Sequence, residues 1–176
     1  MKPPRIIVKI GGAALLNDQA LTKLAADLRA VHQTGVRLLV VHGGGPQATA
    51  LARQLGLKPE FRGRRRVTDA KMLSVVQQAL VGQAGTTLLA ACRAHELPAV
   101  SMSASSGGLV VASRRPPTQV TGVSEPVDFG YVADVKSVDE TLLECLWTGG
   151  FVPMLSSVVI DESGQALNLN ADTLVA

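Results

Sequence analysis

Apolar runs alternate with amphipathic segments along the first part of the chain. Residues 5–11 (Arg-Ile-Ile-Val-Lys-Ile-Gly) and residues 36–41 (Val-Arg-Leu-Leu-Val-Val) are rich in β-branched residues, as buried parallel strands are. Between them, apolar residues recur at helical spacing over residues 18–34, and Asn17 or Asp18 can cap that helix. The strand–helix–strand order predicts a right-handed crossover and a parallel sheet.

Later segments continue this alternation. We expect helices at residues 46–55, 69–95 and 138–148, the second of them broken near residues 82–85, and strands at residues 97–102, 131–135 and 151–155. Two hairpins are also expected, one from residues 107–113 with 119–122 and one from residues 158–160 with 166–169. Strands separated by helices predict an α/β fold.

Composition is that of an ordinary globular protein. The 176 residues suit one domain, with 47% hydrophobic and 18% charged residues. The net charge of +3 is partly concentrated in the arginines at positions 62, 64, 65 and 66, a cluster that fits nucleic acid or a small anionic ligand. Aromatic residues make up only 3% of the chain, which argues against a surface that stacks bases.

The spacing of the cysteines and the first residues of the sequence indicate in which cellular compartment we expect the protein. Cys92 and Cys145 lie in apolar helical patterns without metal-ligand spacing, so we expect buried free thiols in a reducing environment. The sequence has no signal-peptide pattern at its start and no apolar run long enough to cross a bilayer. These features predict a soluble cytoplasmic protein.

A lysine interrupts the first apolar run. If this strand is buried, the Lys9 ammonium needs a paired anion, because an isolated buried charge is strongly destabilising. Gly11 and Gly12 would let backbone N–H groups approach such an anion at the C-terminal end of the parallel sheet. The alternative, an edge strand with Lys9 in solvent, stays open on these residues alone.

A second glycine turn, Gly43-Gly44-Gly45-Pro46, follows the second strand. It predicts a helix N-terminus whose free N–H groups and dipole bind an anion, with neither dinucleotide nor Walker A spacing. His42, just before it, is expected to be a hydrogen-bonded strand-end residue and not a catalytic base. In the polar loop 57–68, one arginine could turn inward and bind a carboxylate through two parallel hydrogen bonds.

Five short motifs occur in order along the chain. They are Val8-Lys9-Ile10-Gly11-Gly12, Val40-Val41-His42-Gly43-Gly44-Gly45-Pro46, Arg66-Val67-Thr68-Asp69, Asp128-Phe129-Gly130-Tyr131-Val132-Ala133-Asp134-Val135 and Asn168-Leu169-Asn170-Ala171-Asp172-Thr173. Their order and spacing resemble those of the amino acid kinase family, and within it the acetylglutamate kinases of arginine biosynthesis. The resemblance covers essentially the whole chain, although members of the family are longer.

This resemblance implies an architecture. The fold would be a three-layer αβα sandwich with a mostly parallel central sheet, as in carbamate kinase, and with a hairpin-rich lid over the C-terminal edge of that sheet. Residues 1–176 would be the N-terminal lobe, which holds the amino acid and forms the dimer. The C-terminal ATP-binding lobe would be absent, and the helix that is just starting at residue 173 fits a chain that is cut there.

The resemblance also implies which residues act on the transferred phosphoryl group. Lys9 would lie between the attacking carboxylate and the γ-phosphoryl group and stabilise the charge of the transition state. Gly11 and Gly12 would approach the phosphates. Asp172 would orient Lys9 and a second lysine that this chain lacks, and the residue pattern alone makes Asp172 a candidate helix N-cap as well.

Further roles concern the amino acid substrate. Gly44 and Gly45 would bind the substrate and the γ-phosphate through backbone N–H groups, Arg66 would pair with the substrate α-carboxylate, and Asn168 would hydrogen-bond the substrate. The implied reaction is ATP-dependent phosphorylation of the side-chain carboxylate of N-acetyl-L-glutamate, with Mg²⁺ accompanying the nucleotide. No general base is needed, because a carboxylate is already ionised at pH 7.

Several alternatives stay open. The substrate could instead be a carrier-protein-linked aminoadipate or another blocked amino acid, since a carrier with an acidic tail would suit the arginine cluster. The chain could also be a non-catalytic module that binds an acylated amino acid and dimerises. We expect a homodimer with the helix at residues 69–95 in its interface, little activity of the 176-residue chain alone, no protein-held metal, and no nucleic-acid or membrane partner.

Overall fold

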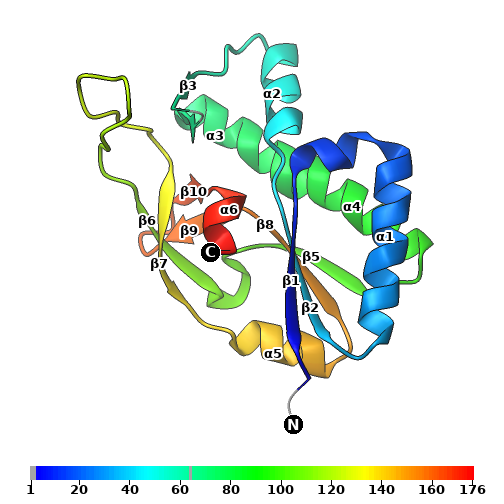
Figure 1. Ribbon diagram of the computed structural model, residues 1–176. Coiled ribbons are helices and arrows are strands. Elements are labelled where there is room, and N and C mark those ends of the chain that lie inside the picture. Colours follow the sequence, from blue (N-terminus) through cyan, green and yellow to red (C-terminus); the bar gives the residue numbers. More distant parts are fainter. Residues whose placement is uncertain (1–2, 64) are drawn as a thin grey trace.

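The computed structural model describes residues 3–63 and 65–176. Its central sheet contains β1 (Arg5–Ile10), β2 (Arg37–His42), β8 (Val152–Ser156) and β5 (Ala99–Ser103), in the order β1-β2-β8-β5. Every neighbouring pair in this sheet is parallel, which confirms the predicted parallel arrangement (Figure 1). All the strands therefore end at the same edge of the sheet.

One face of this sheet is covered by α1 (Asp18–Gln33) and α4 (Gly85–Ala94). The apolar side chains between them form one core cluster, which includes Leu21, Leu28, Leu38, Val40, Leu88 and Met154. The Asn17 side chain accepts a hydrogen bond of 2.9 Å from the backbone N–H of Ala20, so the first of the two predicted caps is the one used.

The other face is covered by α5 (Thr141–Thr148) and by a second sheet. That sheet has the order β10-β9-β6-β7 and consists of β6 (Val110–Arg114), β7 (Ala133–Val138), β9 (Val158–Asp161) and β10 (Ala166–Asn168). Leu39, Val41 and Leu155 of the central sheet share a core cluster with Leu143 of α5 and Val159 of β9. The pairing of β9 with β10 confirms the predicted second hairpin.

A continuous helical run takes the place of the long helix predicted at residues 69–95. It consists of α3 (Ala70–Gln77), the π-helical segment η2 (Gln78–Ala84) and α4, and the Asp69 side chain caps its start by accepting a 2.7 Å hydrogen bond from Met72 N. The expected break near residues 82–85 is a change to π-helical hydrogen bonding and not an interruption. π-Helical segments of this kind are frequent at functional sites.

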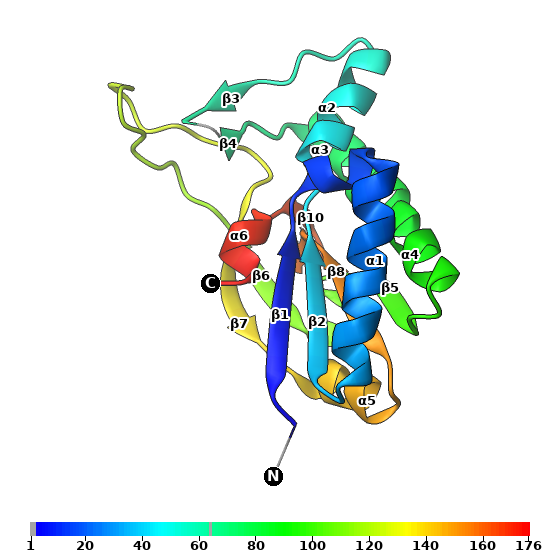
Figure 2. The same ribbon diagram turned by 45° about the vertical axis from the view of Figure 1, so that its right-hand side comes forward.

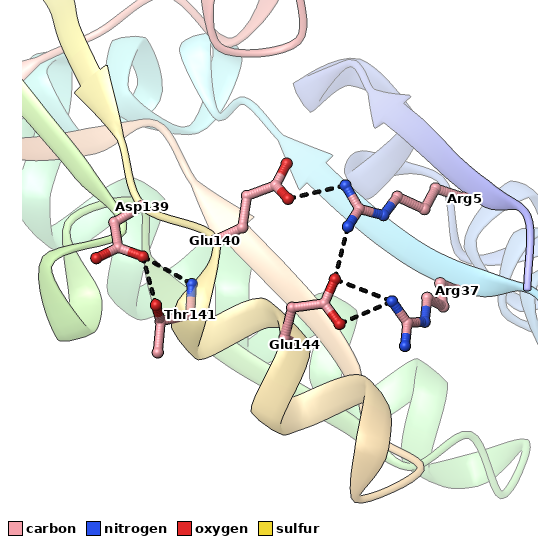
Figure 3. Close-up of polar contacts among 6 residues, drawn as sticks. All are labelled: Arg5, Arg37, Asp139, Glu140, Thr141 and Glu144. Carbon is pink, nitrogen blue, oxygen red and sulfur yellow. Dashed lines mark hydrogen bonds and ion pairs between the residues drawn. The ribbon is translucent and has the colours of Figure 1, made fainter. Parts of the chain in front are cut away.

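Ion pairs hold α5 against the beginnings of β1 and β2. Figure 3 shows Arg5 bound to Glu140 and Glu144, and Arg37 bound to both oxygens of Glu144. The Arg5 and Arg37 guanidinium groups also lie 5.4 and 5.7 Å from the ring centroid of Trp147. This cluster lies where the central strands begin, at the edge of the sheet opposite their C-terminal ends, and it stabilises the packing of α5 there.

Short elements complete the fold. They are η1 (Gly12–Leu16), α2 (Gly45–Gln54), β3 (Phe61–Arg62), β4 (Arg65–Arg66), η3 (Ser106–Gly108) and α6 (Ala171–Leu174). No helix in the described part of the chain is both long and apolar enough to cross a membrane. The loop predicted at residues 57–68 contains a small hairpin formed by β3 and β4. Arg64, which belongs to the predicted arginine cluster, lies outside the described residues.

The structure decides between the two positions left open for the first strand. β1 is an edge strand of the central sheet, with Ile6 and Ile7 being 38% and 53% exposed, because no other strand pairs with its outer side in the described chain. The predicted pairing of residues 107–113 with 119–122 is wrong. β6 pairs with β7, and the intervening residues form a long loop closed by the Thr118–Val127 bridge.

The prediction of two buried thiols holds for one cysteine only. Cys92 is buried against Met154, and burial raises the pKa of its thiol to about 11. Cys145 is exposed, because α5 turns that position away from the sheet while it buries Leu143. An apolar helical pattern shows that a helix has a buried face but does not fix the side of every residue near its boundary.

Candidate functional site

A cavity of about 280 Å³ lies at the C-terminal ends of the central strands. Figure 2 shows the β3–β4 hairpin and the loop after β6 standing beyond the ends of β1 and β2. All the site residues predicted from the sequence line this cavity: Lys9, Gly11, Gly12, Gly44, Gly45, Arg66, Asn168 and Asp172. Open α/β sheets bind ligands at this edge.

Lys9 enters the cavity from the end of β1. Its Nζ lies 2.8 Å from Oδ1 of Asp172, and the two side chains are 34% and 69% exposed. Both sequence interpretations of Lys9 are therefore partly right, because it belongs to an edge strand and still meets a carboxylate at the site. Asp172 is not the helix cap, since Asn170 accepts the capping hydrogen bond of 2.8 Å from Asp172 N.

The two glycine turns touch each other at one end of the cavity. Gly43 N donates to Ile10 O at 3.1 Å, and a methyl group built on Gly12 would lie 3.0 Å from Gly44 Cα. Among the described residues, the backbone N–H groups of four glycines donate no hydrogen bond in a turn or loop: Gly11, Gly12, Gly44 and Gly45. Together with the N-terminus of α2, these donors form a place where an anion is favoured.

Arg66 is the arginine of the loop that turns inward. It is only 9% exposed, and its Nη2 donates to Gly45 O at 3.0 Å and to Thr49 Oγ1 at 2.8 Å. The Phe61 ring covers its guanidinium at 4.7 Å, and burial lowers the pKa of Arg66 from its ordinary value. The guanidinium is thus held at the cavity wall while Arg62 remains exposed and paired with Glu60.

Asn168 is held in position by hydrogen bonds to Thr68 and to Tyr131, which belongs to the motif at residues 128–135. Its Nδ2 donates to Thr68 Oγ1 at 3.2 Å, and its backbone N–H donates to Tyr131 O at 2.9 Å. Gly130 has φ +75°, and a methyl group built on it would lie 2.3 Å from Thr68 O. Thr68, two residues after the end of β4, and Asn168 of β10 are therefore joined through residues 129–131, where position 130 requires glycine.

Sequence reasoning missed two further residues of the site. Arg115 lines the cavity and is only 8% exposed, and its Nε donates to Asp134 Oδ1 at 3.0 Å. No local pattern predicts that Arg115 is buried while its neighbour Arg114 is exposed. Gln47, 3% exposed, lies behind the glycine turns, where its Nε2 donates to Gly12 O at 2.8 Å.

His42 lies beside the site but does not line it. It is fully buried, and its Nδ1 lies 3.0 Å from Gly43 O, as a hydrogen-bonded strand-end histidine should. In the described part of the chain, however, its Nε2 has no hydrogen-bond partner. Burial lowers the pKa of His42, which favours the neutral ring.

Comparison with known proteins identifies the family. The model of the amino acid kinase family matches residues 4–176. The chain belongs to this family. An acetylglutamate kinase from Salinispora tropica is 40% identical over 171 residues, which cover 97% of this chain and 57% of the relative. Another, from Bifidobacterium longum, is 40% identical over 174 residues, which cover 98% of this chain and 56% of the relative.

Solved structures agree with this assignment. N-acetylglutamate synthase from Neisseria gonorrhoeae, complexed with coenzyme A and N-acetyl-glutamate, has a TM-score of 0.76 at 27% identity, over 97% of this chain and 37% of that one. Carbamate kinase from Giardia lamblia bound to AMP-PNP has a TM-score of 0.61 at 15% identity, over 97% and 65% of the two chains, and shows the fold alone. The predicted fold class is confirmed, and the chain spans less than two thirds of these relatives' length.

Proposed function

We propose that this chain is the amino-acid-binding and dimerisation lobe of an acetylglutamate kinase, which phosphorylates the side-chain carboxylate of N-acetyl-L-glutamate with ATP. The observation that carries the proposal is one cavity with Lys9 paired to Asp172 at one place and the buried guanidinium of Arg66 at another. A substrate with two carboxylates has a cationic partner for each. The 40% identical acetylglutamate kinases support this substrate.

The proposed roles follow from the chemistry of the side chains. Arg66 binds the α-carboxylate, Asn168 hydrogen-bonds the substrate, and Lys9, oriented by Asp172, lies beside the side-chain carboxylate that attacks. That carboxylate is already ionised, so catalysis rests on positioning and on positive charge where the transferred group passes. This mechanism requires no general base.

The residues present fit the phosphate end of ATP. A side chain at Gly12 would clash with Gln47 at 2.8 Å and one at Gly44 would clash with Leu80 at 2.7 Å, so both turns need glycine to keep their N–H groups close to the cavity. ATP, when bound, supplies the phosphoryl group, and Mg²⁺ offsets the charge of its phosphates. Among the described residues, no cluster of three His, Cys, Asp or Glu side chains could hold a metal by itself.

The exposed side of β1 supports a second lobe in the working enzyme. Ile6 and Ile7 are apolar, exposed and on a sheet edge with no paired strand in the described chain. Such an edge is normally covered or paired. We expect the 176-residue chain alone to have little or no kinase activity, and robust formation of an acyl phosphate from ATP and N-acetyl-L-glutamate, measured as the hydroxamate, would refute this.

The dimer is proposed to use the face where η2 meets β9. A groove of about 530 Å³ runs between them, and Val81 and Ile160 beside it are 41% and 43% exposed. Light scattering should give a dimer for the parent chain and a monomer for Val81→Asp, with Lys23→Asp on exposed α1 as the control. A monomeric parent would contradict the dimer proposal.

A carrier-linked aminoadipate is the second candidate substrate, and one observation favours it. Arg65 lines both the main cavity and a neighbouring hollow of about 360 Å³, which Gly63, Thr118 and Phe129 also line. A tethered substrate could leave the main cavity along this path. Calorimetry with N-acetyl-L-glutamate and N-acetyl-L-aminoadipate distinguishes the two, because the first proposal requires tighter binding of the glutamate derivative.

A further inference from the structure

We propose that Gln47 is a positioning residue that fixes the Gly11–Gly12 turn against the Gly43–Gly45 turn and so forms the phosphate-binding half of the site. This inference rests on the proposed function for its ligand, the phosphoryl end of a nucleotide. It is carried by the position and the hydrogen bonding of one buried amide, which does not itself line the cavity.

Gln47 adds a side-chain hydrogen bond between two elements whose backbones already meet through Gly43 N and Ile10 O. It belongs to the first turn of α2, whose N-terminus follows the second glycine turn. Its Nε2 reaches across to donate a 2.8 Å hydrogen bond to Gly12 O, the carbonyl at the start of η1. The orientation of the amide follows from this contact, since its oxygen would be repelled by that carbonyl.

The amide is also packed tightly against the first turn. A methyl group built on Gly12 would lie 2.8 Å from Gln47 Oε1, and within the described residues this buried oxygen has no hydrogen-bond partner. A buried acceptor without a donor costs stability. An apolar side chain of similar shape would avoid that cost but would leave the carbonyl of buried Gly12 without its donor. These two effects on stability oppose each other, so stability alone does not account for glutamine at this position.

Binding accounts for it better. The free N–H groups of the two turns can act on one anion only if the turns hold a fixed separation, and Gln47 provides a directional bond between them. Arg66 is attached to the second turn through Gly45 O and to α2 through Thr49, so the amino acid end of the site does not depend on the Gln47 bond. Loss of this bond should therefore weaken anion binding and spare amino acid binding.

The test uses the full 176-residue chain labelled with ¹⁵N-glycine, with inorganic phosphate as the probe. In the parent, phosphate should shift the amide signals of the two turns. Gln47→Met, which keeps the length of the side chain and removes its amide, should weaken phosphate binding about 2- to 12-fold, the range expected for one neutral hydrogen bond. Gln54→Met, at an exposed position of the same helix, should leave phosphate binding unchanged.

Three results would overturn the inference. They are parent glycine signals that phosphate does not move, phosphate affinity that is equal in Gln47→Met and the parent, and a Gln47→Met variant that loses phosphate and N-acetyl-L-glutamate binding alike. A merely structural role predicts the last result together with a lower melting temperature. Failure of the proposed function is seen separately. A parent whose phosphate affinity depends on Gln47 but which does not bind N-acetyl-L-glutamate keeps this inference and rejects that substrate.

Discussion

Adding one methyl group at Gly130 should destabilise the fold and the site together. Gly130 has φ +75°, and the new Cβ would lie 2.3 Å from the carbonyl oxygen of Thr68, which is backbone and cannot swing away. The same contact region contains two hydrogen bonds, from Thr68 N to Phe129 O at 2.9 Å and from Tyr131 N to Thr68 O at 2.7 Å. The substitution thus acts where Thr68, two residues after Arg66, meets the segment that is hydrogen-bonded to Asn168.

The size of the effect follows from these contacts. An L-residue in the left-handed region costs about 1–2 kcal/mol, and each weakened hydrogen bond about 0.5–1.5 kcal/mol, so Gly130→Ala should lower the free energy of unfolding by about 2–5 kcal/mol. For a domain of this length that corresponds to a fall in melting temperature of about 4–20 °C. Urea unfolding followed by circular dichroism measures the first quantity and a thermal scan the second.

Gly164→Ala is the matched control. Gly164 has φ +86°, but no atom lies within 4 Å of the position of its added methyl group. It should therefore show only the backbone term of about 1–2 kcal/mol. Equal destabilisation by the two substitutions would refute the reasoning, because the contact with Thr68 would then contribute nothing.

Three other predictions concern single side chains. Asp172→Asn should change the free energy of unfolding by no more than about 1 kcal/mol, since the carboxylate that pairs with Lys9 is 69% exposed, and a larger loss in urea unfolding would show that the pair is structural. Phe61→Leu should weaken N-acetyl-L-glutamate binding about 2- to 5-fold in calorimetry, because it removes a cation–π contact of about 0.5–1 kcal/mol from Arg66, and unchanged affinity would contradict this. Stability should fall as the pH is lowered below 6.5, the ordinary pKa of histidine, because the unfolded chain then takes up a proton that His42, with its lowered pKa, resists in the fold. Urea unfolding at pH 8 and 5.5 checks this, and His42→Gln should show a smaller difference between the two pH values than the parent.

Much of the fold could be predicted because its elements carry local signals. The capping Asn17, the apolar run of β2 and the Asp69 cap each report on their own neighbourhood, and the structure uses all of them. The partner of β6 could not be predicted in this way. Pairing depends on which distant segment offers a matching edge, and β7 competes successfully with the nearer residues 119–122 because it provides a longer ladder.

The site residues also fall into two groups, those that local sequence predicts and those that only tertiary contacts place. The glycine turns and Lys9 follow strands directly, so the sequence places them at the carboxyl edge of a parallel sheet, and the structure brings them to one cavity. Arg115 and Gln47 have roles set by tertiary contacts alone. Nothing local separates buried Arg115 from exposed Arg114, or buried Gln47 from exposed Gln54, and only packing decides which of each pair faces inward.

The central claim is that this cavity binds N-acetyl-L-glutamate through Arg66. Calorimetric titration of the 176-residue chain with N-acetyl-L-glutamate, beside Arg66→Ala and the exposed control Arg62→Ala, tests it most directly. We expect binding to the parent, affinity about 10- to 150-fold weaker in Arg66→Ala because charged hydrogen bonds are lost, and no change in Arg62→Ala. Absence of binding to the parent, or equal binding by a folded Arg66→Ala variant, would contradict the account.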